Sequence, residues 1–269
     1  MPTQAEIVVG YQAATKKIRD EHRAYVLALW SSLASYREPD IARMLTMLIP
    51  RALGAQRTIA QMTEVYAAAL GGFDPRPIDE LRVTGAALRG VEPEDVYRRP
   101  ARTIYNALAE GKPFEEAVER GRRRMESIAM TDLQLAMRAQ EQESYADRGW
   151  EWYRRILTGE ENCALCILAS TQRYRVGNLK PMHPGCDCES APGGSASDPG
   201  QIINAERLEQ IHELLGGDTT YNRSGRSVKF PDGTVRSYKD VIVREHGEYG
   251  PTLTWRGHKH TGPDDVAAA

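Results

Sequence analysis

All four cysteines of the chain and one of its histidines fall within a single short segment. Cys163-Ala-Leu-Cys166 comes first, and His183-Pro-Gly-Cys186-Asp-Cys188 follows after a spacer. Thiolate and imidazole groups at such spacing are the ligands that a tetrahedral zinc ion requires. The segment offers five donors for four positions, so one donor is either spare or supports a neighbouring ligand. The sequence therefore predicts a zinc site without saying which four donors bind.

Other chemistries of the same residues stay open. Two disulfides would suit four cysteines, but no signal peptide precedes them, which favours a reducing cytoplasm. A thioredoxin-type redox pair needs a strand before Cys-x-x-Cys, whereas the preceding sequence looks helical. Zinc deaminases need His-x-Glu upstream of Pro-Cys-x-x-Cys, and here the order is reversed and the glutamate is missing. The plain alternative is four reduced cysteines buried in a small core.

The expected role of the metal is structural rather than catalytic. The region around the cysteines spans only about forty residues, too few to bury a sufficient core unaided. Metal binding would supply folding free energy directly. No glutamate is obviously placed to act as a general base beside the metal. We therefore expect structural zinc and no enzymatic activity.

Composition indicates an ordinary folded protein and gives no sign of a membrane protein. Charged residues make up 27% of the chain, and the formal net charge is only −2. No stretch of eighteen apolar residues occurs, so no transmembrane helix is expected. A near-neutral net charge argues against bulk electrostatic binding to nucleic acid and leaves room for local basic patches.

Residues 1–148 are expected to be helical, because strong helix formers dominate them. Val26, Leu29, Trp30 and Leu33 recur at helical spacing and form one apolar stripe. Breaks are expected at Glu38-Pro39-Asp40, with Asp40 capping the next helix, and again at Pro50 and Gly54. Further helices are expected over about 55–70, 78–88, from 92 onward and, longest of all, over about 114–147.

A cluster of four arginines lies on the longest expected helix: Arg120, Arg122, Arg123 and Arg124. Such a run is usually a solvated helix face paired with nearby glutamates, and Glu115, Glu116 and Glu119 are close in sequence. The sharper hypothesis is a contact with nucleic-acid phosphates or with an acidic partner.

The second half of the chain changes character. Alternating residues over 150–156 and 171–176 predict two strands on either side of Cys163 and Cys166. The Gly- and Ser-rich stretch that begins at Ala191 predicts a flexible linker, and an amphipathic helix is expected over about 203–215. Asp232-Gly233 predicts a hairpin turn between strands at 227–230 and 234–238. The tail over 246–263 lacks periodicity and is expected to be an extended arm that docks on a partner.

The predicted fold class is mainly α: an elongated helical region followed by a small zinc-stabilised α+β domain and an extended C-terminal hairpin and tail. The predicted division is a helical docking domain over 1–148, a zinc-knuckle domain over 149–192, a linker over 193–202 and a C-terminal region over 203–269.

This layout resembles the MuF-like minor head proteins of tailed bacteriophages. The resemblance rests on a helical N-terminal half, an aromatic-rich strand, Cys-x-x-Cys and His-Pro-x-Cys-x-Cys. The motifs cover about 149–190, and the stretches 245–251 and 255–259 are also similar to the ends of such proteins from phages of actinobacteria. Asp187 stands where the family commonly has a basic residue, which puts any phosphate contact from that position in doubt.

The resemblance implies a structural component of the virion. It would associate with the portal protein and other head proteins at the portal vertex, be present in few copies and assist head assembly, DNA packaging or delivery. It would be found in the host cytoplasm during assembly. Packaged double-stranded DNA is a further implied partner, and neither a membrane nor a small-molecule substrate is implied.

Two other classes compete with this resemblance. A zinc-containing nuclease of the HNH type would use His183 to activate water, with only Asp187 and Glu189 on offer as further metal ligands. A zinc-knuckle adaptor that binds DNA would need a basic surface around 163–188. Glu160, Glu161, Asp187 and Glu189 make that neighbourhood mixed or acidic.

Overall fold

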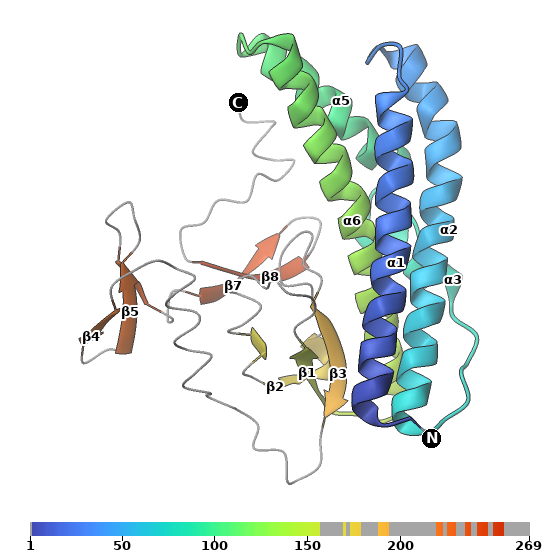
Figure 1. Ribbon diagram of the computed structural model, residues 1–269, viewed down its shortest axis with the longest axis vertical. Coiled ribbons are helices and arrows are strands. Elements are labelled where there is room, and N and C mark those ends of the chain that lie inside the picture. The colour runs from blue at the N-terminus through green and yellow to red at the C-terminus, as the bar shows by residue number, and fades with distance from the viewer. Residues whose placement is uncertain are drawn as a thin grey trace. The chain divides into compact units, whose positions relative to one another are not determined.

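The computed structural model is mainly helical, with small antiparallel sheets in its second half (Figure 1). It describes residues 2–156, 169–170, 173–178, 188–193, 219–222, 225–229, 235–237, 241–246 and 250–255. The chain forms two compact units, Met1–Ser144 and Tyr145–Ala269. Within the described residues, no helix has the combination of length and apolar character needed to cross a membrane.

The first unit consists of four long helices and two short ones. The long helices are α1 (Gln4–Ser31), α2 (Glu38–Gly71), α5 (Pro93–Ala109) and α6 (Phe114–Asp147), whose last turn enters the second unit. The short ones are α3 (Glu80–Val83) and α4 (Ala86–Arg89). α1 and α2 pack side by side (Figure 1). The bounds of α6 match the helix predicted over about 114–147.

The predicted break at Pro50 and Gly54 is wrong, because α2 runs unbroken through both residues. Proline inside a helix costs roughly 3 kcal/mol, so the surrounding packing must outweigh that cost. An apolar stripe at helical spacing continues across Pro50, and its side chains are almost completely buried: Ile41, Met44, Leu45, Leu48, Ala52 and Ile59. The start of α2 also differs from the prediction, since Arg37 occupies the cap position and Pro39 lies in the first turn.

The end of α2 follows the predicted signal. Gly72 adopts a left-handed conformation with φ 69°, which ends the helix at Gly71. The single helix predicted over 78–88 is divided into α3 and α4, because Gly85 between them has φ 61° and cannot continue a right-handed helix.

Two clusters of buried apolar side chains hold the first unit together. One surrounds Trp30, which is 1% exposed, and the other includes Tyr11 stacked on Tyr66 with ring centroids 3.9 Å apart. α5 and α6 approach closely at Gly121, where an added Cβ would lie 2.6 Å from Ile104 Cγ1. Only glycine allows this approach of the two helices.

The second unit contains a three-stranded antiparallel sheet in the order β2-β1-β3. Its strands are β1 (Trp152–Ile156), β2 (Arg173–Arg175) and β3 (Glu189–Gly193), and a 3-10 turn, η1 (Val176–Asn178), follows β2. β1 and β2 correspond to the two predicted strands. The expected linker is wrong at its start, because β3 pairs with β1 as far as Gly193. Pro192 is tolerated there because β3 is an edge strand.

Five further strands lie nearer the C-terminus. β4 (Thr219–Asn222), β5 (Gly225–Lys229) and β6 (Val235–Ser237) form one sheet, in which β5 and β6 pair as the predicted hairpin strands. β7 (Val241–His246) and β8 (Gly250–Trp255) pair with each other. β8 covers part of the segment expected to be an extended arm, and docking of that segment on a partner stays a prediction. The helix predicted over about 203–215 lies outside the described residues.

Candidate functional site

Cys188 is the one predicted metal donor within the described residues, and Cys163, Cys166, His183 and Cys186 lie outside them. Cys188 immediately precedes β3 and is 0% exposed. Its Sγ accepts a hydrogen bond from Arg155 Nη1 over 3.4 Å. In the part of the chain that the structure describes, no three metal-binding side chains come together.

The register of the small sheet fixes where the donor-bearing segment begins and ends. Ile156, the last residue of β1, lies opposite Glu189, the first residue of β3. Arg173, the first residue of β2, lies opposite Arg154. The connection from β1 to β2, which carries Cys163 and Cys166, therefore leaves and re-enters the sheet at the end where Cys188 lies.

An aromatic layer of two tyrosine rings lies on one face of the sheet and reaches Cys188 through Arg155. The rings of Tyr153 and Tyr174 stack with centroids 5.3 Å apart, and the Arg155 guanidinium lies 5.8 Å from the Tyr174 ring centroid. The Tyr174 hydroxyl donates to the Ala169 carbonyl over 3.0 Å. Burial raises the pKa of Tyr174 to about 12, so its hydroxyl stays a donor at neutral pH.

The last turn of α6 is tied to the same sheet. Tyr145 is completely buried, and its hydroxyl lies 3.1 Å from both the carbonyl and the hydroxyl oxygen of Ser190. Trp150 packs edge-on against the Tyr145 ring at 5.5 Å. Ser190 is two residues beyond Cys188, so this contact fixes the backbone beside that predicted metal donor.

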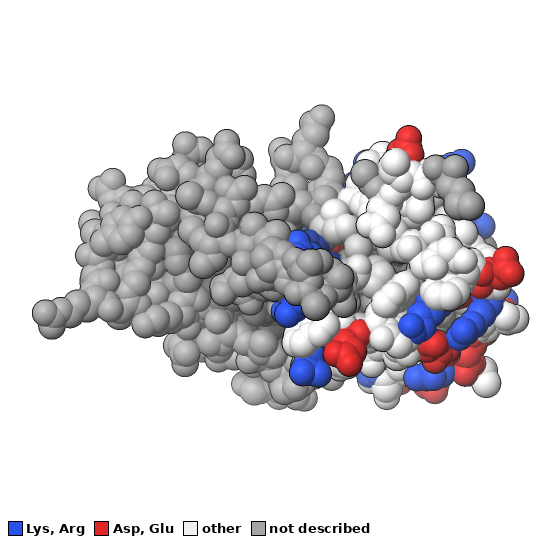
Figure 2. All heavy atoms as spheres, turned by 90° about the horizontal axis from the view of Figure 1, so that it is seen from below, with Lys and Arg blue, Asp and Glu red and all other residues white. Residues whose placement is uncertain are grey.

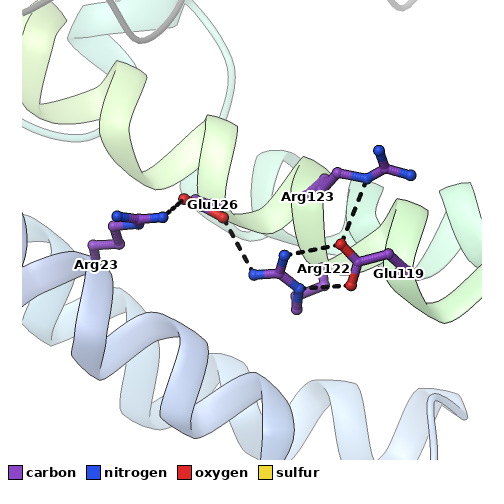
Figure 3. Close-up of polar contacts among 5 residues, drawn as sticks. All are labelled: Arg23, Glu119, Arg122, Arg123 and Glu126. Atoms are coloured by element: carbon purple, nitrogen blue, oxygen red, sulfur yellow. Dashed lines mark hydrogen bonds and ion pairs between the residues drawn. The ribbon is translucent and has the colours of Figure 1, made fainter. Parts of the chain in front are cut away.

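The predicted arginine cluster pairs with glutamates on its own helix and nearby. Arg120 contacts Glu116 at 2.9 Å and Glu110 at 3.3 Å. Arg122 donates to Glu119 at 2.7 Å and lies 3.3 Å from Glu126, as Figure 3 shows.

Two more contacts extend this network. Arg123 lies 3.6 Å from Glu119, and Glu126 also contacts Arg23 of α1 at 2.5 Å, so the network crosses between two helices (Figure 3). Hydrogen bonding from Arg122 lowers the pKa of Glu119, which keeps that carboxylate charged. Arg124 lies on the same helix, half-buried. The cluster is thus largely neutralised by adjacent carboxylates.

Sequence reasoning missed a buried polar centre in the first unit. Asp132 of α6 accepts a hydrogen bond from Arg89 Nε over 2.6 Å and another from the Tyr97 hydroxyl over 2.7 Å. The three residues come from α4, α5 and α6, so one carboxylate links three helices. Asp132 is the one charged residue between Glu126 and Arg138, and its isolation in a largely apolar stretch is the signal that could have marked it as buried.

His22 of α1 lies near this centre and is 2% exposed. Neither of its ring nitrogens has a hydrogen-bond partner among the described residues. Burial lowers its pKa to about 4, against an opposing effect of the Asp132 carboxylate and with a smaller lowering by Arg51. His22 is therefore neutral at physiological pH.

A second group that was missed lies on the small sheet, where Trp152 contacts two arginines. Arg173 and Arg175 each place Cζ 4.5 Å from the Trp152 ring centroid. Their alternation along β2 was visible in the sequence, but the strand that brings Trp152 beside them was not.

Comparison of the chain with protein-family models, with curated proteins and with solved structures found no match.

Proposed function

We propose that this chain is a structural minor head protein of a tailed phage, of the MuF-like kind. The observation that carries the proposal is the pairing of Ile156 with Glu189, which closes the five-donor segment at one end of a small sheet. This arrangement supports a metal-tied module directly after a helical region, the order on which the resemblance rests.

The surroundings of Cys188 support a structural zinc ion held by four of the five donors. Zinc binds the thiolate form of cysteine, and a neighbouring guanidinium stabilises that negative charge. Arg155 supplies such a group at 3.4 Å from Sγ, itself held between the aromatic layer and the sulfur. Complete burial of Cys188 suits a closed site better than one open to substrate.

The helical unit offers a surface for docking on the portal protein or other head proteins. The α1–α2 and α5–α6 connections lie at the same end of this unit (Figure 1). Tyr105 and Phe114 are about half exposed there, and Tyr36 links them: its carbonyl accepts from the Tyr105 hydroxyl over 2.9 Å, and its ring lies 6.5 Å from Phe114. Exposed aromatic side chains held in place by such contacts are typical anchors of protein interfaces.

On this proposal the protein acts without catalysing a reaction. It joins the portal vertex in few copies during assembly in the host cytoplasm and stays in the virion. Its partners are the portal protein, other head proteins and packaged double-stranded DNA.

Metal content of the purified chain tests the zinc module. We expect about one zinc per chain in the wild type and loss of zinc when Cys163→Ser is combined with Cys188→Ser, because at most one of the five donors is spare. His258→Gln changes a histidine outside the donor segment and serves as the control that keeps its zinc. A freshly purified, reduced wild-type chain without metal would remove the basis of this module.

Mass spectrometry of purified particles of the phage that encodes the chain tests the virion role. We expect the chain in particles at a small fraction of the major capsid protein. Phe114→Ser combined with Tyr105→Ser should lower its incorporation, whereas Val9→Ser, at an exposed apolar residue of α1, should not. Particles that contain no copy of the chain would contradict the proposal.

A further inference from the structure

One face of the β1–β2 pair combines a tryptophan with three arginines. Residues directly opposite each other in an antiparallel pair share a face of the sheet. Trp152 lies opposite Arg175, and Arg154 lies opposite Arg173. These four residues form what we call the basic face. Arg175 is exposed, and the other three are half-buried, whereas Tyr153 and Arg155 on the other face are buried.

The Trp152 indole holds two guanidinium groups in place. Arg173 and Arg175 both lie over its ring, each with Cζ 4.5 Å from the centroid. A guanidinium that stacks on an aromatic ring keeps its N–H groups directed outward in its own plane. Those N–H groups can then donate in pairs to an oxygen anion without a further loss of side-chain freedom.

Anion binding by the basic face depends on two of its arginines, Arg173 and Arg175. Neither Arg173 nor Arg175 forms an ion pair with a carboxylate among the residues that the structure describes. The arginines of α6 differ, since Arg120, Arg122 and Arg123 each contact glutamate. Figure 2 likewise shows acidic and basic side chains interspersed on the described part of the surface that it presents.

We propose that the basic face binds the phosphate backbone of double-stranded DNA. The planar guanidinium matches phosphate oxygens in pairs, which makes arginine a preferred phosphate contact. Duplex DNA carries one negative charge for about every 1.7 Å of its axis, whereas an extended acidic peptide carries at most one for about every 3.3 Å. Closely spaced arginines therefore gain more binding free energy from the duplex than from an acidic peptide.

The geometry also argues against recognition of single-stranded bases. Proteins that bind single strands use open aromatic rings as platforms on which bases stack. The Trp152 ring already contacts two guanidinium groups. The basic face is therefore suited to the backbone, and binding should show no sequence preference and a steep dependence on salt.

Fluorescence anisotropy of a labelled 20-base-pair duplex, titrated with the full zinc-loaded chain over a salt series, tests this proposal. Arg173→Gln combined with Arg175→Gln should flatten the slope of log affinity against log salt by about 1.8, since each phosphate contact contributes about 0.9. At 0.1 M salt the affinity should fall roughly thirty- to a hundredfold. Arg122→Gln combined with Arg123→Gln removes the same charge from α6 and should change the affinity less than about twofold.

Two single variants distinguish the loss of a phosphate contact from the loss of the folded sheet. The single change Arg175→Gln, at the exposed position, should flatten the slope by about 0.9, and Arg175→Lys should leave the slope nearly intact. Equal losses in the sheet and α6 variants, or no loss in either, would overturn the proposal. The proposal would also be overturned if a poly-glutamate peptide, at the same total charge as the duplex, displaced the duplex. Tighter binding of a single strand than of the duplex would overturn it as well.

This inference rests on the proposed function for its partner, packaged DNA, and assigns that partner to the basic face. DNA binding by the purified chain is measured without portal or capsid proteins, and metal content and incorporation into particles are measured without DNA binding. Failure of either proposal can therefore be recognised by itself.

Discussion

Acidification should destabilise the helical unit through His22. The folded state holds this side chain neutral with a pKa of about 4, against 6.5 in the absence of burial. Between these two values the unfolded chain binds a proton that the folded chain does not. The free energy of unfolding must therefore fall as pH falls through this window and be fully restored above about pH 6.5.

The shift sets the size of the effect. A difference of about 2.5 pKa units corresponds to about 3 kcal/mol in total, of which about 2 kcal/mol should be lost by pH 5. This is a large share of the stability of a typical domain, which lies at about 5–15 kcal/mol. Mild acidification should therefore lower the urea concentration at which the helical unit unfolds.

Urea unfolding followed by far-ultraviolet circular dichroism, at constant ionic strength between pH 4.5 and 7.5, measures this dependence. Carboxylates titrate in the same range, so the informative quantity is the difference between wild type and His22→Gln, in which all other groups cancel. That difference should change by about 2 kcal/mol between pH 7 and pH 5. A difference that stays constant over this range would show that His22 is not held neutral, and the reasoning from its burial would fail.

The remaining predictions concern the helical core and the surroundings of Cys188. Asp132→Asn should lower the free energy of unfolding by about 3–5 kcal/mol, because Arg89 would keep a buried charge without its counter-ion. Asp132→Leu combined with Arg89→Met removes both charges and should lower the free energy of unfolding clearly less. Urea unfolding measures both variants, and an equal loss in the two would contradict this account. Gly121→Ala should destabilise by about 1–3 kcal/mol through its contact with Ile104. Gly54→Ala, where an added Cβ meets nothing within 4 Å, should instead stabilise α2 by up to about 1 kcal/mol, as thermal unfolding would show. Arg155→Met should weaken zinc retention in a competition with a chelator by about ten- to a hundredfold, whereas Arg154→Met on the other face of β1 should not.

The sequence was most informative where local signals and packing agree. α6 could be predicted from its strong helix formers, and the end of α2 from Gly71-Gly72. Pro50 led to a wrong prediction of a helix break. The tendency of proline to end a helix is outweighed there by an apolar stripe whose burial depends on α1 and α5. The pairing of the α6 arginines followed from glutamates three and four residues away, a spacing that places side chains side by side on a helix.

Features that depend on distant parts of the chain could not be predicted in this way. The uncharged residues on both sides of Asp132 indicate that it is buried. They do not indicate that Arg89 and Tyr97 reach it from other helices. β3 contains Pro192 and Gly193, residues that argue for a linker, and only its edge position beside β1 makes a strand acceptable. The metal donors stay a prediction from residue type and spacing, whereas the arginine beside Cys188 depends on strand pairing.

The pairing of Ile156 with Glu189 has a thermodynamic consequence for any metal bound between them. Bringing together two ends of a loop of roughly thirty residues costs about 3 kcal/mol of chain entropy. The β1–β3 ladder meets this cost through its own hydrogen bonds, so a metal ion would order only the shorter connections within the loop. Removing the ion should then leave the sheet as a scaffold to which it can return. On the proposed function, zinc would therefore bind to and leave a chain whose small sheet is already folded.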